Sequence, residues 1–142
     1  MITSAGERTA FLTSLLGHRW TPERTCWHVA ALVELRLFGR VLPHVEVPPD
    51  PSWAWMITAI ASHPERENWR DVAPPLAGLV TAADGSLACL GSLKRAAHIG
   101  VWLAPERRVI HCDQTLGVVA EDVATLRARG WGRVQFFEPS SD

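Results

Sequence analysis

The sequence has no tyrosine, no Cys-x-x-Cys pair and no apolar run long enough to cross a bilayer. Its three cysteines, Cys26, Cys89 and Cys112, cannot all pair with one another, so at least one is free unless it bonds to another chain. Without a Cys-x-x-Cys pair, a closed structural zinc site is not expected. These absences predict a protein with no metal, no bound cofactor and no membrane span.

The sequence also lacks an excess of either charge. Its 14 Lys and Arg residues are balanced by 15 Asp and Glu residues, for a net charge of −1. This balance gives no general electrostatic reason to bind nucleic acid or an anionic membrane. Residues 1–8 lack a basic region followed by a long apolar run, so we expect no secretory signal. Synthesis in the cytoplasm is therefore expected, with another route of delivery if the substrate lies outside it.

The composition supplies the material for one core. A chain of 142 residues fits a single domain, residues 1–142, and 47% of them are hydrophobic. Seven tryptophans without a tyrosine suggest aromatic clefts as well as core. Four prolines within residues 40–51 predict an extended loop. This loop and the following segment 53–55 are candidates for shaping a cleft or contacting a neighbouring subunit.

Helices come first in the predicted order, and strands follow. Apolar residues at helical spacing, with caps at Ser4, Thr25 and Gly39, indicate the early helices. The predicted helices span residues 4–17, 25–39, 50–63 and 117–129, and residues 65–75 form a short helix or turn followed by a loop. The predicted strands span residues 87–90, 98–103, 108–112 and 133–137. This order is typical of an α+β domain.

Cys26 is the centre of the functional hypothesis. If Thr25 caps the helix, Cys26 occupies the first helical position, where free N–H groups and the positive end of the helix dipole favour thiolate over thiol. Thr21 followed by Pro22 is a competing helix start, which would place Cys26 in the second turn and remove much of this benefit. We prefer Thr25 as the cap, and the thiolate is then a nucleophile.

A nucleophile needs a base, and the base needs a group that orients it. His98 begins one predicted strand, and His111 lies on the next, across a turn at residues 105–107. Backbones of paired strands lie roughly 5 Å apart, so the two rings can form a hydrogen bond through which His111 fixes the tautomer of His98. A helix N-terminus packed against this hairpin would bring Cys26 to His98.

Structural roles for these residues stay open on the residues alone. A cysteine on a helix is commonly a small core residue, and His98 and His111 can be satisfied polar residues at a sheet edge. His28 lies about 200° around the helix from Cys26 and faces away from it. A zinc set is conceivable, although its spacing matches no standard site: Cys89, His98, His111 and Cys112. Three further histidines fall in predicted loops: His18, His44 and His63.

Four stretches resemble a known family when taken in this order. Residues 26–33 (CWHVAALV) are similar to a nucleophile helix, and residues 37–43 (LFGRVLP) to the end of that helix. Residues 97–102 (AHIGVW) are similar to a His-x-Gly strand, and residues 109–111 (VIH) to the strand of a third polar residue. Together with residues 117–137 they resemble the NlpC-type cell-wall cysteine peptidases, in particular the short versions encoded with phage tail genes and gene transfer agents.

The resemblance implies a papain-like NlpC-type α+β domain, with N-terminal helices packed on a small antiparallel sheet. It implies a cysteine endopeptidase or amidase in which Cys26, His98 and His111 hydrolyse an amide bond of peptidoglycan stem peptides. The implied partners are peptidoglycan and phage-like tail proteins, with delivery to the cell wall in the tail of a phage-like particle. Family members cut the link between D-glutamate and the diamino acid or the muramoyl–L-alanine amide, and the residues here do not choose between them.

The family pattern is not matched around the nucleophile. Thr25 stands where aspartate is usual, and His28 stands where glycine is common. The family's upstream tyrosine, which helps form the oxyanion site, is replaced by Trp20 as the nearest aromatic residue. Trp20, Trp27 and His18 are therefore the candidates for oxyanion or substrate contacts. The departures also motivate a rival, a catalytically silent tail-tip or wall-binding component. A second rival is an acyltransferase or amidase with a non-wall substrate, since the same thiol chemistry serves both.

Overall fold

A six-stranded antiparallel sheet forms the centre of the fold in a computed structural model, which describes residues 1–72, 78–92 and 95–140. The strand order is β1-β6-β2-β3-β4-β5. The strands are β1 (Trp69–Asp71), β2 (Leu87–Gly91), β3 (His98–Leu103), β4 (Arg108–Asp113), β5 (Gly117–Glu121) and β6 (Arg133–Pro139). The helices are α1 (Ala5–Leu15), α2 (Cys26–Phe38), α3 (Trp53–Ser62), the 3-10 helix η1 (Pro64–Asn68) and α4 (Val123–Ala128). The chain is therefore α+β, as predicted.

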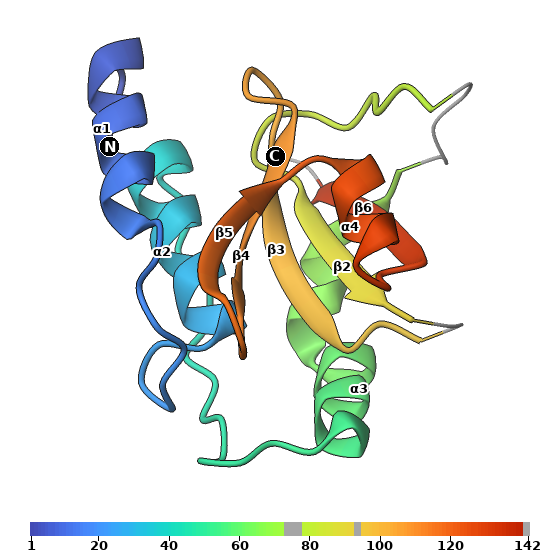
Figure 1. Cartoon of the computed structure of the whole chain (residues 1–142). Helices are drawn as coiled ribbons and strands as arrows, with labels where there is room; N and C mark the ends of the chain where they lie inside the picture. Colours follow the sequence, from blue (N-terminus) through green and yellow to red (C-terminus); the bar gives the residue numbers. More distant parts are fainter. Residues whose placement is uncertain (73–77, 93–94, 141–142) are drawn as a thin grey trace.

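Apolar side chains cover both faces of the sheet, because successive strand residues point in opposite directions. Ile99 and Val101 of β3 pack with Val33 and its neighbours on α2. Trp102 of β3 packs on the other face with Leu126 of α4. Figure 1 shows α1 and α2 on one side of the sheet and α4 on the other. We refer to these as the α2 side and the α4 side.

The start of α2 is built by the local sequence, as predicted. Thr25 is the N-cap, and its hydroxyl accepts a hydrogen bond from the N–H of His28 at 3.4 Å. The Nδ1 of His28 in turn accepts from the N–H of Thr25 at 3.2 Å, so a histidine completes the capping box. Thr21 pairs with Arg24 in a separate turn. Cys26 is consequently the first residue of the helix.

Other caps and turns also lie where the sequence places them. Ser4 caps α1 by accepting from the N–H of Glu7. Gly39 ends α2 with a φ of 67°, the left-handed conformation that glycine adopts without strain. The hairpin of β3 and β4 matches the predicted strands at residues 98–103 and 108–112, and strands also cover residues 87–90 and 133–137. Local hydrogen bonds and turn residues therefore fix most element boundaries.

Residues 117–129 do not form the single helix that we expected. They form β5, then a cap at Asp122, then the short helix α4. β5 pairs with residues 109–113 of β4, and this pairing overrides the local preference for a helix. The branched Val118 and Val119 also suit a strand.

Two further boundaries differ from the prediction. The helix expected from residue 50 begins only after the cap Ser52. Residues 65–75 contain a strand that was not expected, since β1 pairs with β6. The last part of that segment, residues 73–75, falls outside the described residues. Within the described part of the chain, no helix is long and apolar enough to cross a membrane.

Candidate functional site

Cys26 lies at the N-terminus of α2 with 4% of its surface exposed. It belongs to the core cluster of the α2 side, together with Ile99 of β3. Burial raises the pKa of its thiol to about 11, although the backbone N–H groups of Ile99, Trp27 and Cys26 itself favour the thiolate. The expectation of a lowered pKa is therefore wrong, because desolvation outweighs the helix terminus. The resting side chain is a neutral thiol.

The rings of His98 and His111 meet on the α4 side of the sheet. His111 pairs in register with Gly100, two residues beyond His98 on the same face. A Cβ atom on Gly100 would lie 2.9 Å from the Cβ of His111, so glycine leaves the space in which the rings approach. The Nε2 of His98 lies 2.8 Å from the Nδ1 of His111. The hydrogen bond predicted between the two rings is therefore present.

A carboxylate and a guanidinium extend this pair. The Nε2 of His111 lies 2.8 Å from Oε1 of Glu121, and Arg129 donates to both oxygens of Glu121 at 2.7 Å. Burial alone would raise the pKa of Glu121, but hydrogen bonds from Arg129 and His111 lower it below its usual value. Glu121 is thus ionised at neutral pH. We call the series Arg129, Glu121, His111 and His98 the histidine relay.

The relay determines which nitrogen of His98 is free. An ionised carboxylate only accepts hydrogen bonds, so the Nε2 of His111 carries a hydrogen and donates a hydrogen bond to Glu121. Burial lowers the pKa of His111, so the ring is neutral and its Nδ1 is an acceptor. His98 must then donate from its Nε2. Burial lowers the pKa of His98 to about 3, so its ring is also neutral and its Nδ1 keeps a lone pair. That nitrogen can accept a proton.

Cys26 and His98 line one polar cavity of about 280 Å³. They reach it from opposite faces, because Ile99 points to the α2 side and His98 to the α4 side. The His98 ring stacks on Trp131, with ring centroids 5.0 Å apart and planes 12° apart. In the described part of the chain no hydrogen bond joins the Cys26 sulfur to His98, as is common for catalytic pairs without substrate. Cys26 and His98 therefore share one cavity, although they come from different sides of the sheet.

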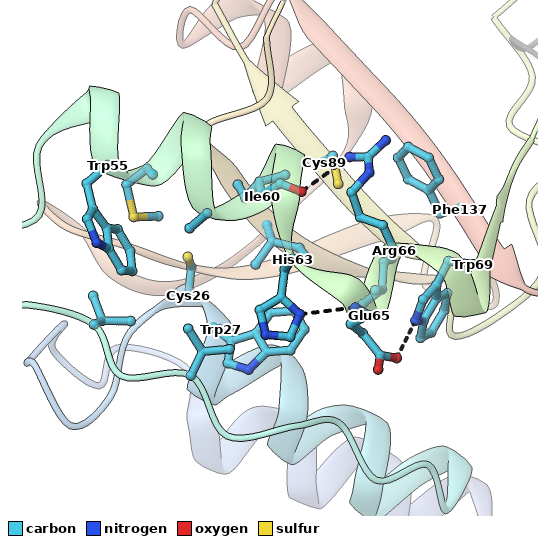
Figure 2. Close-up of a pocket in the computed structure, with 16 residues that line it drawn as sticks. Cys26, Trp27, Trp55, Ile60, His63, Glu65, Arg66, Trp69, Cys89 and Phe137 are labelled. Atoms are coloured by element: carbon cyan, nitrogen blue, oxygen red, sulfur yellow. Dashed lines mark hydrogen bonds between the residues drawn. The ribbon is translucent and has the colours of Figure 1, made fainter.

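A second cavity, of about 110 Å³, meets the first at Cys26 and is lined mostly by apolar side chains. Figure 2 shows the Cys26 sulfur pointing toward α3, between Trp55 and Ile60. Val47 and Met56 border both cavities, so the two are neighbours. The proline-rich loop and α3 therefore shape the cleft, one of the two roles considered for them.

The three candidates for oxyanion or substrate contact lie in different places. Trp20 lines the polar cavity with Cys26 and His98. Trp27 lines the apolar cavity, but its indole N–H already donates to the carbonyl of Pro43 at 2.8 Å. His18 is exposed beside Arg24 and lines neither of these two cavities. Of the three side chains, only that of Trp20 belongs to a residue that shares the polar cavity with Cys26 and His98.

The four residues considered for zinc are divided by the sheet. Cys89 and Cys112 belong to the α2-side core, whereas His98 and His111 hydrogen-bond on the α4 side. Among the described residues, no group of three or more His, Cys, Asp or Glu side chains is arranged to hold a metal ion. All three cysteines are free thiols.

Glu121 and Arg129 are the members of the histidine relay that the sequence did not indicate. Both fall in the helix predicted over residues 117–129, where an acidic residue near the start and a basic residue near the end match the helix dipole. The signal that could have found Glu121 is the Val118-Val119 pair, which favours a strand beside β4. In the observed register His111 pairs with Val119, so Glu121 lies two residues along on the same face.

Comparison of the chain with known protein families found no family model that matches, and comparison with curated proteins found no match either.

Proposed function

We propose that this chain is a cysteine hydrolase of the papain-like NlpC type. Its proposed substrate is an amide bond in peptidoglycan stem peptides, and its proposed setting is the tail of a phage or gene transfer particle. The observation that supports the catalytic part is the histidine relay, which leaves the Nδ1 of His98 as a proton acceptor on the cavity that Cys26 lines. The wall substrate and the tail partners are supported by the motif resemblance.

The proposed reaction has two stages. The Cys26 sulfur attacks the carbonyl carbon while its proton moves to the Nδ1 of His98, forming a tetrahedral intermediate. The C–N bond then breaks as His98 returns that proton to the leaving amine, and a thioester remains on Cys26. Water attacks the thioester and gives a proton to His98. The C–S bond breaks, the carboxylic acid leaves, and the proton returns to Cys26.

Burial of both partners favours proton transfer during the attack over a preformed ion pair. The thiol pKa is raised and the imidazole pKa is lowered, each by desolvation of its charged form. Separating charge before substrate binds would therefore be unfavourable. A fixed acceptor at His98 removes the need for a free thiolate, provided that the substrate brings the sulfur and Nδ1 into reach.

The oxyanion of the intermediate needs donors near the start of α2. The N–H groups of Cys26 and Trp27 belong to the first turn, where helices leave such groups without intrahelical partners. The indole of Trp20 borders the same cavity and is the candidate replacement for the tyrosine hydroxyl. Backbone donors preorganised in this way are typical of acyl-transfer sites.

The direct test is release of soluble stem-peptide fragments from purified peptidoglycan, identified by mass spectrometry. We expect release by the wild type and none by Cys26→Ala. Cys112→Ala is the matched control, since Cys112 is a buried thiol of the same core that lines neither cavity. Equal release by Cys26→Ala would contradict the proposal.

A second candidate is the catalytically silent tail-tip or wall-binding component. The observation that favours it is the burial of Cys26, with 4% of its surface exposed and a raised thiol pKa. This candidate predicts that wild type and Cys26→Ala sediment equally with peptidoglycan and that neither releases fragments. Fragment release that depends on Cys26 would exclude it.

A further inference from the structure

The two cavities that meet at Cys26 differ in chemistry, and the difference gives the substrate a direction. The polar cavity contains His98 and Asp113, with Thr25 and Thr115 on its wall. The apolar cavity contains neither histidine of the relay, and most of its lining is aromatic, aliphatic or sulfur-containing. Cys26 thus lies between a polar side that contains His98 and a mainly apolar side.

The chemistry of acyl transfer assigns the two sides. His98 must protonate the leaving group, so the leaving group has to lie in the cavity that His98 lines. The acyl group stays bonded to the Cys26 sulfur after the leaving group departs. It must therefore occupy the other side of the sulfur, where Figure 2 shows Trp55 and Ile60 on either side of the space that Cys26 faces.

We propose that the cavity between α2, α3 and the sheet is an acyl pocket that accepts a short apolar group on the acyl side of the scissile bond. This inference rests on the proposed function and adds a substrate class to it. In a peptide substrate the occupant is an aliphatic segment or side chain next to the reacting carbonyl.

The polar groups at the edge of the pocket are already engaged. The Nδ1 of His63 accepts from the N–H of Glu65 at 3.1 Å, and a Glu65 oxygen accepts from the indole N–H of Trp69 at 2.8 Å. Arg66 is exposed and lies over the ring of Phe137. A polar acyl group would lose water on entering a pocket whose lining is mainly apolar.

The volume limits the size of the occupant. An apolar protein cavity of about 150 Å³ holds one benzene molecule. The acyl pocket measures about 110 Å³. A chain of about four to six carbons therefore fills it.

The test is acylation of Cys26 by three nitrophenyl esters that differ only in the acyl chain: 4-nitrophenyl acetate, butyrate and methoxyacetate. Each rate is divided by the rate of the same ester with free N-acetylcysteine, which removes intrinsic reactivity. The S–C bond forms, the C–O bond to nitrophenolate breaks, and the thiol proton passes through His98 to solvent. Peptide mass spectrometry locates the acyl group on Cys26.

We expect butyrate to exceed acetate by about tenfold, as burial of two methylene groups predicts, and to exceed methoxyacetate as well. Ala59→Phe, which fills the pocket, should abolish the preference for butyrate. Ala61→Phe, on the exposed face of the same helix, should keep it. With 4-nitrophenyl hexanoate and octanoate added to the series, Ile60→Ala, which enlarges the pocket, should extend the longest favoured acyl chain from hexanoate to octanoate. This provides a second variant if Ala59→Phe does not fold.

The outcomes separate the two proposals. Acylation of Cys26 without a preference for butyrate, or a preference that both Ala59→Phe and Ile60→Ala leave unchanged, would overturn the acyl pocket while the proposed hydrolase stands. Failure of all three esters to acylate Cys26 would contradict the hydrolase itself, and the pocket with it.

Discussion

The two sides of the sheet treat their buried carboxyl groups in opposite ways. On the α2 side, desolvation decides: burial raises the pKa of the carboxyl of Glu34, as it raises the pKa of the thiols of Cys26, Cys89 and Cys112. On the α4 side, desolvation also keeps the rings of His98 and His111 neutral, but hydrogen bonds outweigh it at Glu121, whose pKa is lowered. One side therefore keeps its buried carboxyl neutral, and the other holds an ionised carboxylate against two neutral imidazoles.

Two buried carboxylates show the cause of the difference. Glu34 is fully buried, with one oxygen 2.7 Å from Arg40 and the other without a hydrogen-bond partner within the described structure. Both oxygens of Glu121 accept hydrogen bonds from Arg129, and one also accepts from His111. Satisfying both oxygens keeps a buried carboxylate ionised, and only an ionised Glu121 holds His111 in the tautomer that the proposed mechanism needs.

The largest expected effect comes from removing the base. His98→Ala should lower kcat/KM for fragment release or ester hydrolysis by about 10³-fold at pH 7, because it removes the proposed acceptor of the thiol proton. The exposed His44 supplies the matched control, and His44→Ala should retain full activity. A decrease in kcat/KM of less than tenfold in His98→Ala would contradict the assignment of the base to the α4 side.

A stability change of about 3 kcal/mol is expected at Glu34, since burial raises its pKa from 4.5 to about 7. The folded state holds this proton more tightly than the unfolded state, so the contribution is complete below pH 4.5 and is lost as the pH rises through 7. Urea unfolding from pH 4.5 to 8 should show this decline in the wild type and not in Glu34→Gln. Parallel curves for the two proteins would show that the α2 side does not keep Glu34 neutral.

Glu121→Gln should lower kcat by about 10- to 100-fold and leave KM unchanged. A glutamine amide can donate to the Nε2 of His111, which reverses the tautomers of both rings and places a proton on the Nδ1 of His98. Nitrogen NMR of the imidazoles should report that reversal. Glu46→Gln, an exposed carboxylate with 93% of its side chain accessible, should change neither kcat nor the spectra. A rise in KM with kcat and the spectra unchanged would assign Glu121 a merely structural role.

The smallest effect is expected at the cap of α2. Thr25→Ala removes the hydroxyl that accepts from the N–H of His28, and should lower the free energy of unfolding by about 1 kcal/mol. Ser52→Ala, at the cap of α3, should cost a similar amount without slowing acylation of Cys26. Thermal unfolding and the rate of Cys26 acylation are measured for both variants, and only Thr25→Ala should slow acylation. Equal slowing by both variants would mean that the Thr25 cap has no special part in placing Cys26.

Features set by neighbouring residues could be predicted from the sequence. The capping residues Thr25 and Gly39 fixed the limits of α2, and the turn at residues 105–107 fixed the hairpin that brings His98 and His111 together. Each depends on hydrogen bonds or backbone angles within a few positions. The α+β class followed from the order of these elements.

Features that depend on distant partners could not be predicted. The strand β5 gains its stability from pairing with β4, and Glu121 enters the relay only because of that register. The pKa of Cys26 depends on how much protein covers the thiol, which the helix start alone does not reveal. The apolar cavity requires α3, η1 and the sheet to come together, so no single stretch of sequence indicates it.

The most direct test of the central claim is the rate of Cys26 acylation by 4-nitrophenyl butyrate from pH 6 to 9, in wild type and His98→Ala. The wild-type rate should be nearly constant, because a neutral His98 accepts the proton during attack throughout this range. In His98→Ala only the thiolate can react, so the rate should rise about tenfold per pH unit toward the thiol pKa of about 11. A wild-type rate that climbs with pH in parallel with the variant would contradict the account, because His98 would then take no part in activating Cys26.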